Sequence, residues 1–364
     1  VLFYQQYVYY EDGSEDIIVS DLSWKVSDGP IVFDDIYDGE RYDARLEKDG
    51  WDMPDYADKD WADACKVSEK MGRLVSQGTF PAVKVIKPRI PVSMTQPQAG
   101  VYLYDFGQNF AGWVHLTVQG KPGDVISVHY AELKDEKTGM LCPNTNRNAE
   151  ALDTYTCKGD GTEIFEPHFT YHGFRYMQMK IEGKAEIIRV VAEHVYNSVK
   201  NTGTFSCSDE TVNKLHEMAV MTEKNNLHSI MTDCPQRDER LMWLNDLSSR
   251  IYQNINNFDL AKMLRKCVYD FMDTQRENGA IADTAPFIGG TIPADPVCAA
   301  MLVFTLNAYR FYGDKALVNE SYGACKKWVD FLVGKSDNYI VEYSYYGDWV
   351  MPEKYIKARV PGEY

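Results

Sequence analysis

The sequence predicts a multidomain chain in which two strand-rich regions are followed by a helical region. Alternating apolar and polar residues, divided by glycine-containing turns, fill roughly the first 200 residues and are typical of strands. A mostly polar stretch with four prolines, between residues 81 and 97, separates these strands into two regions. After Asn201 the apolar residues recur at helical spacing instead. The 364 residues suffice for two or three domains, and we divide them at 1–88, 89–200 and 201–364.

Composition excludes some classes of function. The net charge of −16 argues against nucleic acid and against anionic membrane surfaces as partners. No apolar run approaches the roughly 20 residues that a membrane-spanning helix needs. The eight cysteines are scattered singly, without metal-ligand or disulfide spacing, so we expect free buried thiols. The chain opens in a strand without a methionine and shows no signal peptide, so we expect the true N-terminus to lie upstream, which leaves the compartment open.

The first region contains strands and turns. Residues 1–10 are β-prone, residues 11–13 form a hairpin turn, and residues 17–19 make the answering strand. Farther on, the segment 37–45 carries several charges of both signs. On residue types alone, these charges suit an ion-paired surface loop as well as a functional one.

The second region begins near Gly100. Residues 101–118 end in strict alternation, a turn follows at 120–124, residues 125–133 return as a strand, and another strand alternates through 176–181. Four histidines here are predicted to be hydrogen-bonded structural groups, and we assign them no metal: His115, His129, His168 and His172.

Five helices are predicted in the last region. Ser208 is a suitable N-cap for the first, whose apolar residues are Val212, Leu215, Ala219 and Leu227. The second follows Trp243, and the last two are expected over about 297–312 and 315–333. The third should end at Gly279 and carries a clear apolar stripe, formed by Leu260, Met263, Leu264, Cys267, Val268, Phe271 and Met272.

The chemistry concentrates in the loop before the second helix. Residues 232–246 hold four carboxylates, two guanidinium groups and a tryptophan, and Pro235 keeps their first part out of a helix. Carboxylates this dense repel one another, and packing can keep one of them protonated near neutral pH. A proton-donating carboxyl beside ionised partners is what cleavage of a glycosidic bond requires. The alternative is a solvated loop in which Asp246 only caps the helix.

The order of residues in this loop resembles the active-site signature of the bacterial α-L-rhamnosidases, glycoside hydrolase family 78. It runs Asp233-Cys-Pro-Gln-Arg237-Asp-Glu239-Arg, with Trp243 and Asp246 following. Segments 39–45, 105–113 and 169–176 are similar to stretches of the β-sandwich domains of this family. The resemblance implies two β-sandwich domains followed by the first half of an all-α (α/α)6 catalytic barrel.

The resemblance also implies roles. An inverting glycosidase needs a general acid and a carboxylate base on opposite faces of the sugar. Glu239 occupies the position of the acid, and the family's base is expected beyond Tyr364, so we expect residues 1–364 alone to be inactive. Because half a barrel leaves apolar helix faces without neighbours, we also expect these residues alone to be poorly soluble or molten in the helical half. The residues implied to contact rhamnose are Asp233, Arg237, Trp243, Asp246 and Trp349, with Asp238 as a supporting group. Three further aspartates are predicted to be substrate contacts or structural groups: Asp283, Asp295 and Asp348.

Two departures from the family pattern put the exact sugar and leaving group in doubt. Met242 and Asn245 stand where many members have glycine, and Asp295-Pro296 is followed by Val297 and Cys298 rather than by a small residue and a tryptophan. An aromatic wall of the pocket would then be missing or supplied by another residue.

Three classes of function remain open from the sequence: an inverting α-L-rhamnosidase, another sugar-active enzyme of the (α/α)6 type, and a non-catalytic carbohydrate-binding protein. The acidic loop favours the two enzymes, because a binding module needs no clustered proton donors. The expected partner is a rhamnose-containing glycoside or polysaccharide. No cofactor or metal is assigned, and the oligomeric state stays open.

Overall fold

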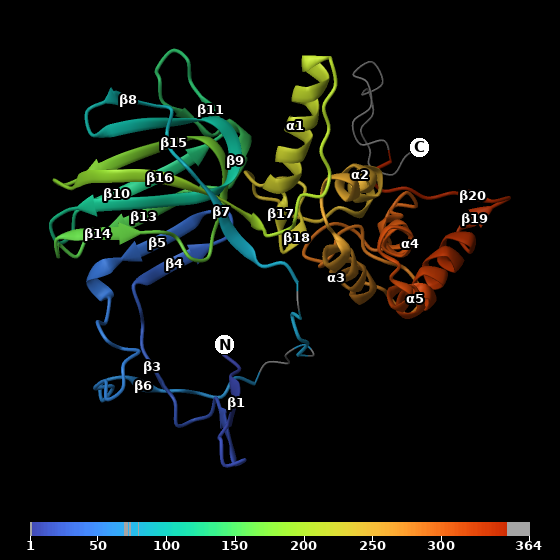
Figure 1. The fold of residues 1–364 in the computed structure, drawn as a ribbon, viewed down its shortest axis with the longest axis horizontal. Helices are drawn as coiled ribbons and strands as arrows, with labels where there is room; N and C mark the ends of the chain where they lie inside the picture. Colours follow the sequence, from blue (N-terminus) through green and yellow to red (C-terminus); the bar gives the residue numbers. More distant parts are fainter. Residues whose placement is uncertain (1, 69–71, 73, 79, 348–364) are drawn as a thin grey trace.

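The computed structural model describes residues 2–68, 72, 74–78 and 80–347. Its N-terminal part is rich in strands and its C-terminal part is helical, and Figure 1 shows the two lying side by side. Helix α1 (Glu210–Asn225) contacts strands β9 and β16 of the large sheet, so it lies where the two parts meet.

The N-terminal hairpin confirms the first strands that the sequence predicts. Strand β1 (Gln5–Tyr9) pairs antiparallel with β2 (Glu15–Val19) across the predicted turn. A second small pair joins β3 (Lys25–Val26) to β6 (Ala62–Asp63).

A ten-stranded, curled sheet forms most of the strand-rich part, in the order β4-β5-β13-β10-β15-β9-β16-β7, with β8 and β14 also paired to β9. Strand β9 (Val101–Gln119) links the strands, because its first half pairs with β15 and β8 and its second half with β16 and β14. Its alternating apolar side chains, among them Val114, Leu116 and Val118, are fully buried in the core of the sheet. The remaining strands are β4 (Ile31–Asp35), β5 (Gly39–Asp43), β7 (Val83–Arg89), β8 (Ser93–Gln98), β10 (Val125–Ala131), β13 (Leu152–Thr156), β14 (Thr162–Phe165), β15 (His172–Glu182) and β16 (Glu186–Asn197).

The segment 37–45 belongs to this sheet and is not a free surface loop. Strand β5 pairs in parallel with β13, so residues of the predicted first region complete the sheet of the second. Gly39 allows this approach: its φ is +109°, and a Cβ there would lie 2.3 Å from the carbonyl oxygen of Leu152. Glu40 is completely buried and accepts hydrogen bonds from the backbone of His168 and Phe169.

The five predicted helices are all present among the described residues. Besides α1 they are α2 (Leu244–Asn257), α3 (Ala261–Asp273), α4 (Ala300–Tyr312) and α5 (Lys315–Val333). Two predicted helix ends are wrong. Asp209, one residue after Ser208, caps α1 by accepting from the backbone of Thr211 and Val212. Helix α3 ends at Asp273, and the hydroxyl of its C-cap Thr274 donates to the carbonyl of Phe271, while Gly279 forms a later turn.

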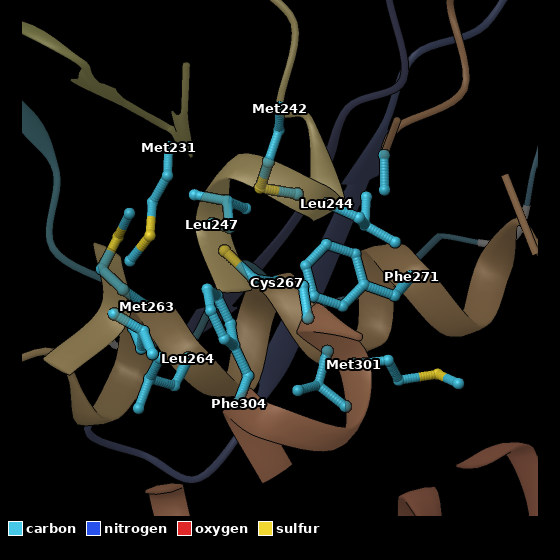
Figure 2. Packing of buried hydrophobic residues seen from close by; sticks show 14 of the residues in the cluster. Met231, Met242, Leu244, Leu247, Met263, Leu264, Cys267, Phe271, Met301 and Phe304 are labelled. Carbon is cyan, nitrogen blue, oxygen red and sulfur yellow. The ribbon is translucent and has the colours of Figure 1, made fainter. Parts of the chain in front are cut away.

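The helical part has its own core, formed by one face each of α2, α3 and α4. Figure 2 shows Cys267 and Phe271 of α3 packed among Leu244 and Leu247 of α2 and Phe304 of α4. The stripe predicted for α3 is buried except for Met272, which is partly buried, whereas Val212 and Leu215 of α1 are exposed in the described structure. This core holds α2, and therefore the end of the acidic loop, in a fixed position.

No helix in the described residues has the length and apolar character to cross a bilayer. All eight cysteines are unpaired, as predicted, but Cys65 and Cys207 are exposed and not buried.

Candidate active site

The acidic loop runs between the sheet and the helical core. Its ends are joined by a hydrogen bond from the backbone N–H of Asp233 to the carbonyl of Leu241, at 2.8 Å. Trp243 then precedes the first turn of α2 with an extended backbone. On the sheet side, Gly173 in β15 lets the loop approach, because a Cβ there would lie 2.8 Å from Cγ of Pro235 and 2.9 Å from the backbone nitrogen of Gln236.

Asp233 and Glu239 form the centre of the site. Their carboxylate oxygens and the sulfur of Cys234 lie within 4.8 Å of one another. Burial raises the pKa of Asp233 to about 6, and the negative charges of Asp246 and Glu239 add to this rise. Asp233 is therefore largely protonated below about pH 6. A protonated carboxyl in this loop is what the sequence predicts from its dense carboxylates.

Glu239 is held at both oxygens. Its Oε2 lies 2.7 Å from Nη2 of Arg237 and 2.9 Å from Nη2 of Arg147, and its Oε1 accepts from the indole N–H of Trp243 at 2.9 Å. Only 11% of the side chain is exposed. The hydroxyl of Tyr37 donates to the backbone carbonyl of Glu239 at 2.9 Å, so side chain and backbone are both fixed.

Arg237 links the two carboxylates and the thiol. Its Nη2 lies 3.8 Å from Oδ2 of Asp233, and its Nε donates to the sulfur of Cys234 at 3.0 Å. Burial, with the nearby charge of Glu239, raises the pKa of Cys234 to about 11, so this thiol is neutral and is no nucleophile at neutral pH.

Asp238 points to a different set of partners. Its carboxylate accepts from Nε of Arg147 at 3.1 Å and from the side-chain amide of Asn148 at 2.8 Å. Burial alone would raise the pKa of Asp238, but the bonds from Asn148 and the charge of Arg147 outweigh it and lower that pKa. Asp238 is therefore ionised and serves as an anchor for the strand-rich part.

The other predicted site residues lie around this centre. Asp246 is exposed in the first turn of α2, where its charge suits the helix dipole, but it makes no capping hydrogen bond. Trp243 meets Tyr346 edge to face at 5.6 Å, so a second aromatic ring lies beside the tryptophan. Trp349 and Asp348 fall outside the described residues.

Arg240 couples the loop to the sheet. Its backbone is left-handed, with φ of +53°, and its guanidinium lies 4.3 Å over the ring of Tyr171 while donating to the carbonyls of Ile36 and Tyr171. Tyr171 stacks in turn on His228 at 3.9 Å. Burial, together with the charge of Arg240, lowers the pKa of His228 to about 3, so the ring is neutral beside the buried cation.

Sequence reasoning missed Arg147 and Tyr37. Arg147 follows the 3-10 turn Pro143–Asn146, a polar stretch without periodicity, and its contact with Glu239 spans 92 residues. No local signal predicts a contact of that range. For Tyr37 a signal existed, because it lies two residues before the segment 39–45 that resembles the family.

The residues that depart from the family pattern differ in burial. The side chain of Met242 is buried in the helical core and is seen there in Figure 2. Asn245 is exposed in the first turn of α2. Cys298 is buried, and Val297 is exposed.

Asp283 and Asp295 act as structural groups. Asp283 is buried and accepts from both the backbone N–H and the hydroxyl of Thr291. Asp295 is buried and accepts from the hydroxyl of Ser344 and from the backbone of Tyr345 and Tyr346. Each aspartate therefore braces a loop of the helical part.

The histidines of the strand-rich part have hydrogen-bond partners, as predicted. His172 bonds Asp153, His168 bonds Glu40, and His129 bonds the carbonyl of Glu150. His115 contacts Glu166 and, with Glu193, forms a group of donor atoms within 4.8 Å, as Asp233, Cys234 and Glu239 do in the loop. Such groups are compatible with a cation, but in the loop Arg237 and Arg147 already supply the positive charge.

Three domain families match the chain in order. The N-terminal domain of α-L-rhamnosidase matches residues 1–87, the bacterial α-L-rhamnosidase concanavalin-like domain matches residues 95–196, and the bacterial α-L-rhamnosidase six-hairpin glycosidase domain matches residues 200–364.

Relatives of known name agree with these matches. The chain is 33% identical over 352 residues to an α-L-rhamnosidase of Streptomyces avermitilis and 34% identical over 368 residues to one of Formosa agariphila. The matches cover 96% and 94% of this chain but 34% and 38% of those proteins, so the chain spans little more than a third of their length.

Solved structures show the same relationship. The structure of α-L-rhamnosidase from Dictyoglumus thermophilum matches 97% of this chain and 40% of its own, at 39% identity and a TM-score of 0.91. The Streptomyces avermitilis α-L-rhamnosidase complexed with L-rhamnose matches 96% of this chain and 34% of its own, at 32% identity and a TM-score of 0.90. By its three matched domains and by these relatives, the chain belongs to the bacterial α-L-rhamnosidases.

Proposed function

We propose that the intact protein carrying this chain is an α-L-rhamnosidase. It would hydrolyse terminal α-linked L-rhamnose from glycosides or polysaccharides with inversion, and Glu239 would be the general acid. The observation that carries this proposal is the paired carboxyls of Asp233 and Glu239, held under two guanidinium groups and an indole N–H. Rhamnose as the sugar is supported by the related structure that is described as complexed with L-rhamnose.

Each residue then has a role that its chemistry suits. Glu239 donates a proton to the glycosidic oxygen, and the donors around it stabilise the carboxylate that remains. Asp233, Arg237 and Asp246 hold sugar hydroxyls through charge-assisted hydrogen bonds. Trp243, with Tyr346 beside it, forms an apolar wall, and the family resemblance gives Trp349 the same role. Asp238 supports the site through Arg147.

The geometry of the pair bears on stereochemistry. Retaining glycosidases place two carboxyl groups about 5–5.5 Å apart on opposite sides of the anomeric carbon, and inverting enzymes about 6.5–9.5 Å. Asp233 and Glu239 lie close together and share Arg237, so both would face the sugar from one side. A nucleophile must attack from the other side, so Asp233 does not suit that role. We assign the general base to none of the carboxylates in the described part of the chain.

For the fold, we propose that α1–α5 belong to an (α/α)6 barrel, with the division at 1–88, 89–200 and 201–364. In this proposal β4 and β5 of the first region complete the sheet of the second. The apolar faces of α2, α3 and α4, which already pack on one another, support a barrel wall of this kind.

The test is hydrolysis of an aryl α-L-rhamnoside by the intact protein, followed by proton NMR. We expect the first-formed sugar to be the β-anomer of L-rhamnose. An initial α-anomer would overturn inversion and leave the rhamnosidase proposal standing. Release of a different sugar from a panel of aryl glycosides would favour another glycosidase of this fold, and binding without turnover would favour a carbohydrate-binding protein.

A further inference from the structure

We propose that Arg147, which the strand-rich part contributes to the site, is a positioning residue for Glu239. This inference rests on the proposed function, because it assigns Arg147 a task in the proton transfer by Glu239. It means that the catalytic site is completed by the sheet and is not a property of the helical part alone.

The backbone next to Arg147 is fixed by buried neighbours. The 3-10 turn before it contains Asn146, which is buried and donates from its side-chain amide to the carbonyl of Tyr130 at 2.9 Å. Tyr130 is fully buried in strand β10. Arg147 itself has a positive φ, of +55°, directly after this turn. A flexible surface arginine would have no such anchor.

The guanidinium of Arg147 contacts two consecutive acidic residues. Its Nε bonds Oδ1 of Asp238 at 3.1 Å, and its Nη2 bonds Oε2 of Glu239 at 2.9 Å. Asn148 holds the second oxygen of Asp238 at 2.8 Å. Asp238 thus orients Arg147, and Arg147 orients Glu239. The planar guanidinium can do both because its N–H donors have a fixed geometry.

The charged and titratable groups around Glu239 set the expected sign. Arg147 and Arg237 favour its ionised form, whereas Asp233 opposes it, and Cys234 is neutral. Arg237 is also engaged by Asp233 and Cys234. Loss of Arg147 therefore leaves Glu239 less firmly oriented and removes one of the two cations that contact its carboxylate.

The experiment is Arg147→Met in the intact protein, assayed on aryl α-L-rhamnosides with poor and activated leaving groups across pH. We expect kcat on the poor leaving group to fall by about 10- to 100-fold, because small misplacement of a catalytic group is costly. We expect the alkaline limb of kcat/KM to move to higher pH, since an opposite charge has been removed from beside a carboxylate that is only 11% exposed.

Arg41→Met is the matched control. Arg41 has a side chain 52% exposed, against 48% for Arg147, and it also pairs with a glutamate of the strand-rich part, Glu150. This variant should keep both kcat and the pH profile. Asp238→Asn should reproduce the Arg147→Met effects weakly, because it loosens the anchor and leaves the cation.

If Arg147→Met does not fold, Arg147→Ala with added guanidinium ion replaces it, and recovery of activity supports the inference. Unchanged kcat and pH profile in folded Arg147→Met, or no recovery with guanidinium, would overturn it. A folded parent protein without α-L-rhamnosidase activity would instead overturn the proposed function, so the two failures are distinguishable.

Discussion

Asp233 and Asp238 lie in the same loop but face different regions of the molecule. Asp233 faces the helical part, where burial and the charges of Asp246 and Glu239 raise its pKa to about 6. Asp238 faces the strand-rich part, where Asn148 and Arg147 overcome the effect of its burial and lower its pKa. Two carboxyls that look alike in the sequence therefore differ in protonation, because their partners come from different parts of the chain.

The two regions also contribute different things to Glu239. The helical part supplies Trp243, next to α2, and the loop itself supplies Arg237. The strand-rich part supplies Arg147 and Tyr37. A site built across such an interface depends on how closely the two parts pack, which makes the interface itself testable.

The largest effect is expected for Glu239→Gln. In the proposed role, kcat on poor leaving groups should fall by roughly 10²–10⁴, the usual range for general acid catalysis. Activated leaving groups need little protonation and should lose less. Steady-state kinetics with both kinds of aryl α-L-rhamnoside measures the difference.

Glu150→Gln is the control for that variant, because Glu150 is a half-exposed glutamate of the strand-rich part, paired with Arg41. It should retain parental kinetics. Equal losses on both substrates in Glu239→Gln would show that Glu239 is not the acid.

The packing between the two regions is tested by Gly173→Ala. The new Cβ would meet Pro235 and the backbone of Gln236 at under 3.0 Å, so the acidic loop must shift away from β15. We expect a loss of about 1–3 kcal/mol in the free energy of unfolding, as for other overpacked sites, with lower activity.

Gly323→Ala is the matched control for Gly173→Ala. Gly323 lies within α5, and a Cβ there meets nothing within 4 Å. Alanine should leave stability unchanged or raise it by about 0.5–1 kcal/mol, because glycine is a poor helix former. Urea denaturation of both variants checks the contrast, and an undisturbed Gly173→Ala would argue against the close approach.

The raised pKa of Asp233 predicts a pH-dependent stability. The pKa of this carboxyl rises from its ordinary value of 3.8 to about 6 in the folded protein, so folding takes up a proton between these two pH values. The contribution of Asp233 to stability therefore falls as pH rises through that window. Asp233→Asn removes this loss. The free energy of unfolding of the variant, relative to that of the parent, should increase by about 1–2 kcal/mol from pH 3.5 to pH 7.5. Urea titrations at the two pH values measure it, and a pH-independent difference would contradict the assignment.

The smallest effect, of opposite sign, is expected for Asp238→Asn. A lowered pKa means that ionised Asp238 stabilises the fold above its unfolded pKa and that this contribution is lost as pH falls through the lowered folded value. The variant should therefore lose stability relative to the parent at pH 7.5 but not at acid pH. We expect less than about 1 kcal/mol, because the pair with Arg147 is partly exposed. A loss of equal size at both pH values would mean that packing and not charge is responsible.

Much of the fold was predictable because local patterns report burial. Alternation in β9 and the stripe of α3 both correspond to buried faces. The helix ends were less predictable, since Asp209 rather than Ser208 caps α1. The pairing of β5 with β13 could not be predicted, because a parallel pair joins distant segments and neither segment carries a residue pattern that identifies its partner.

The order of strand-rich and helical regions, and the loop that carries the acidic groups, can both be read from the amino-acid sequence. These depend on residue type and spacing, which act over a few residues. The raised pKa of Asp233 and the identity of the cations that contact Glu239 depend on the folded arrangement, because burial and charge at a group are set by the residues that pack against it. Arg147 contacts Glu239 although 92 positions separate them in the sequence, and no local pattern predicts a contact over that separation.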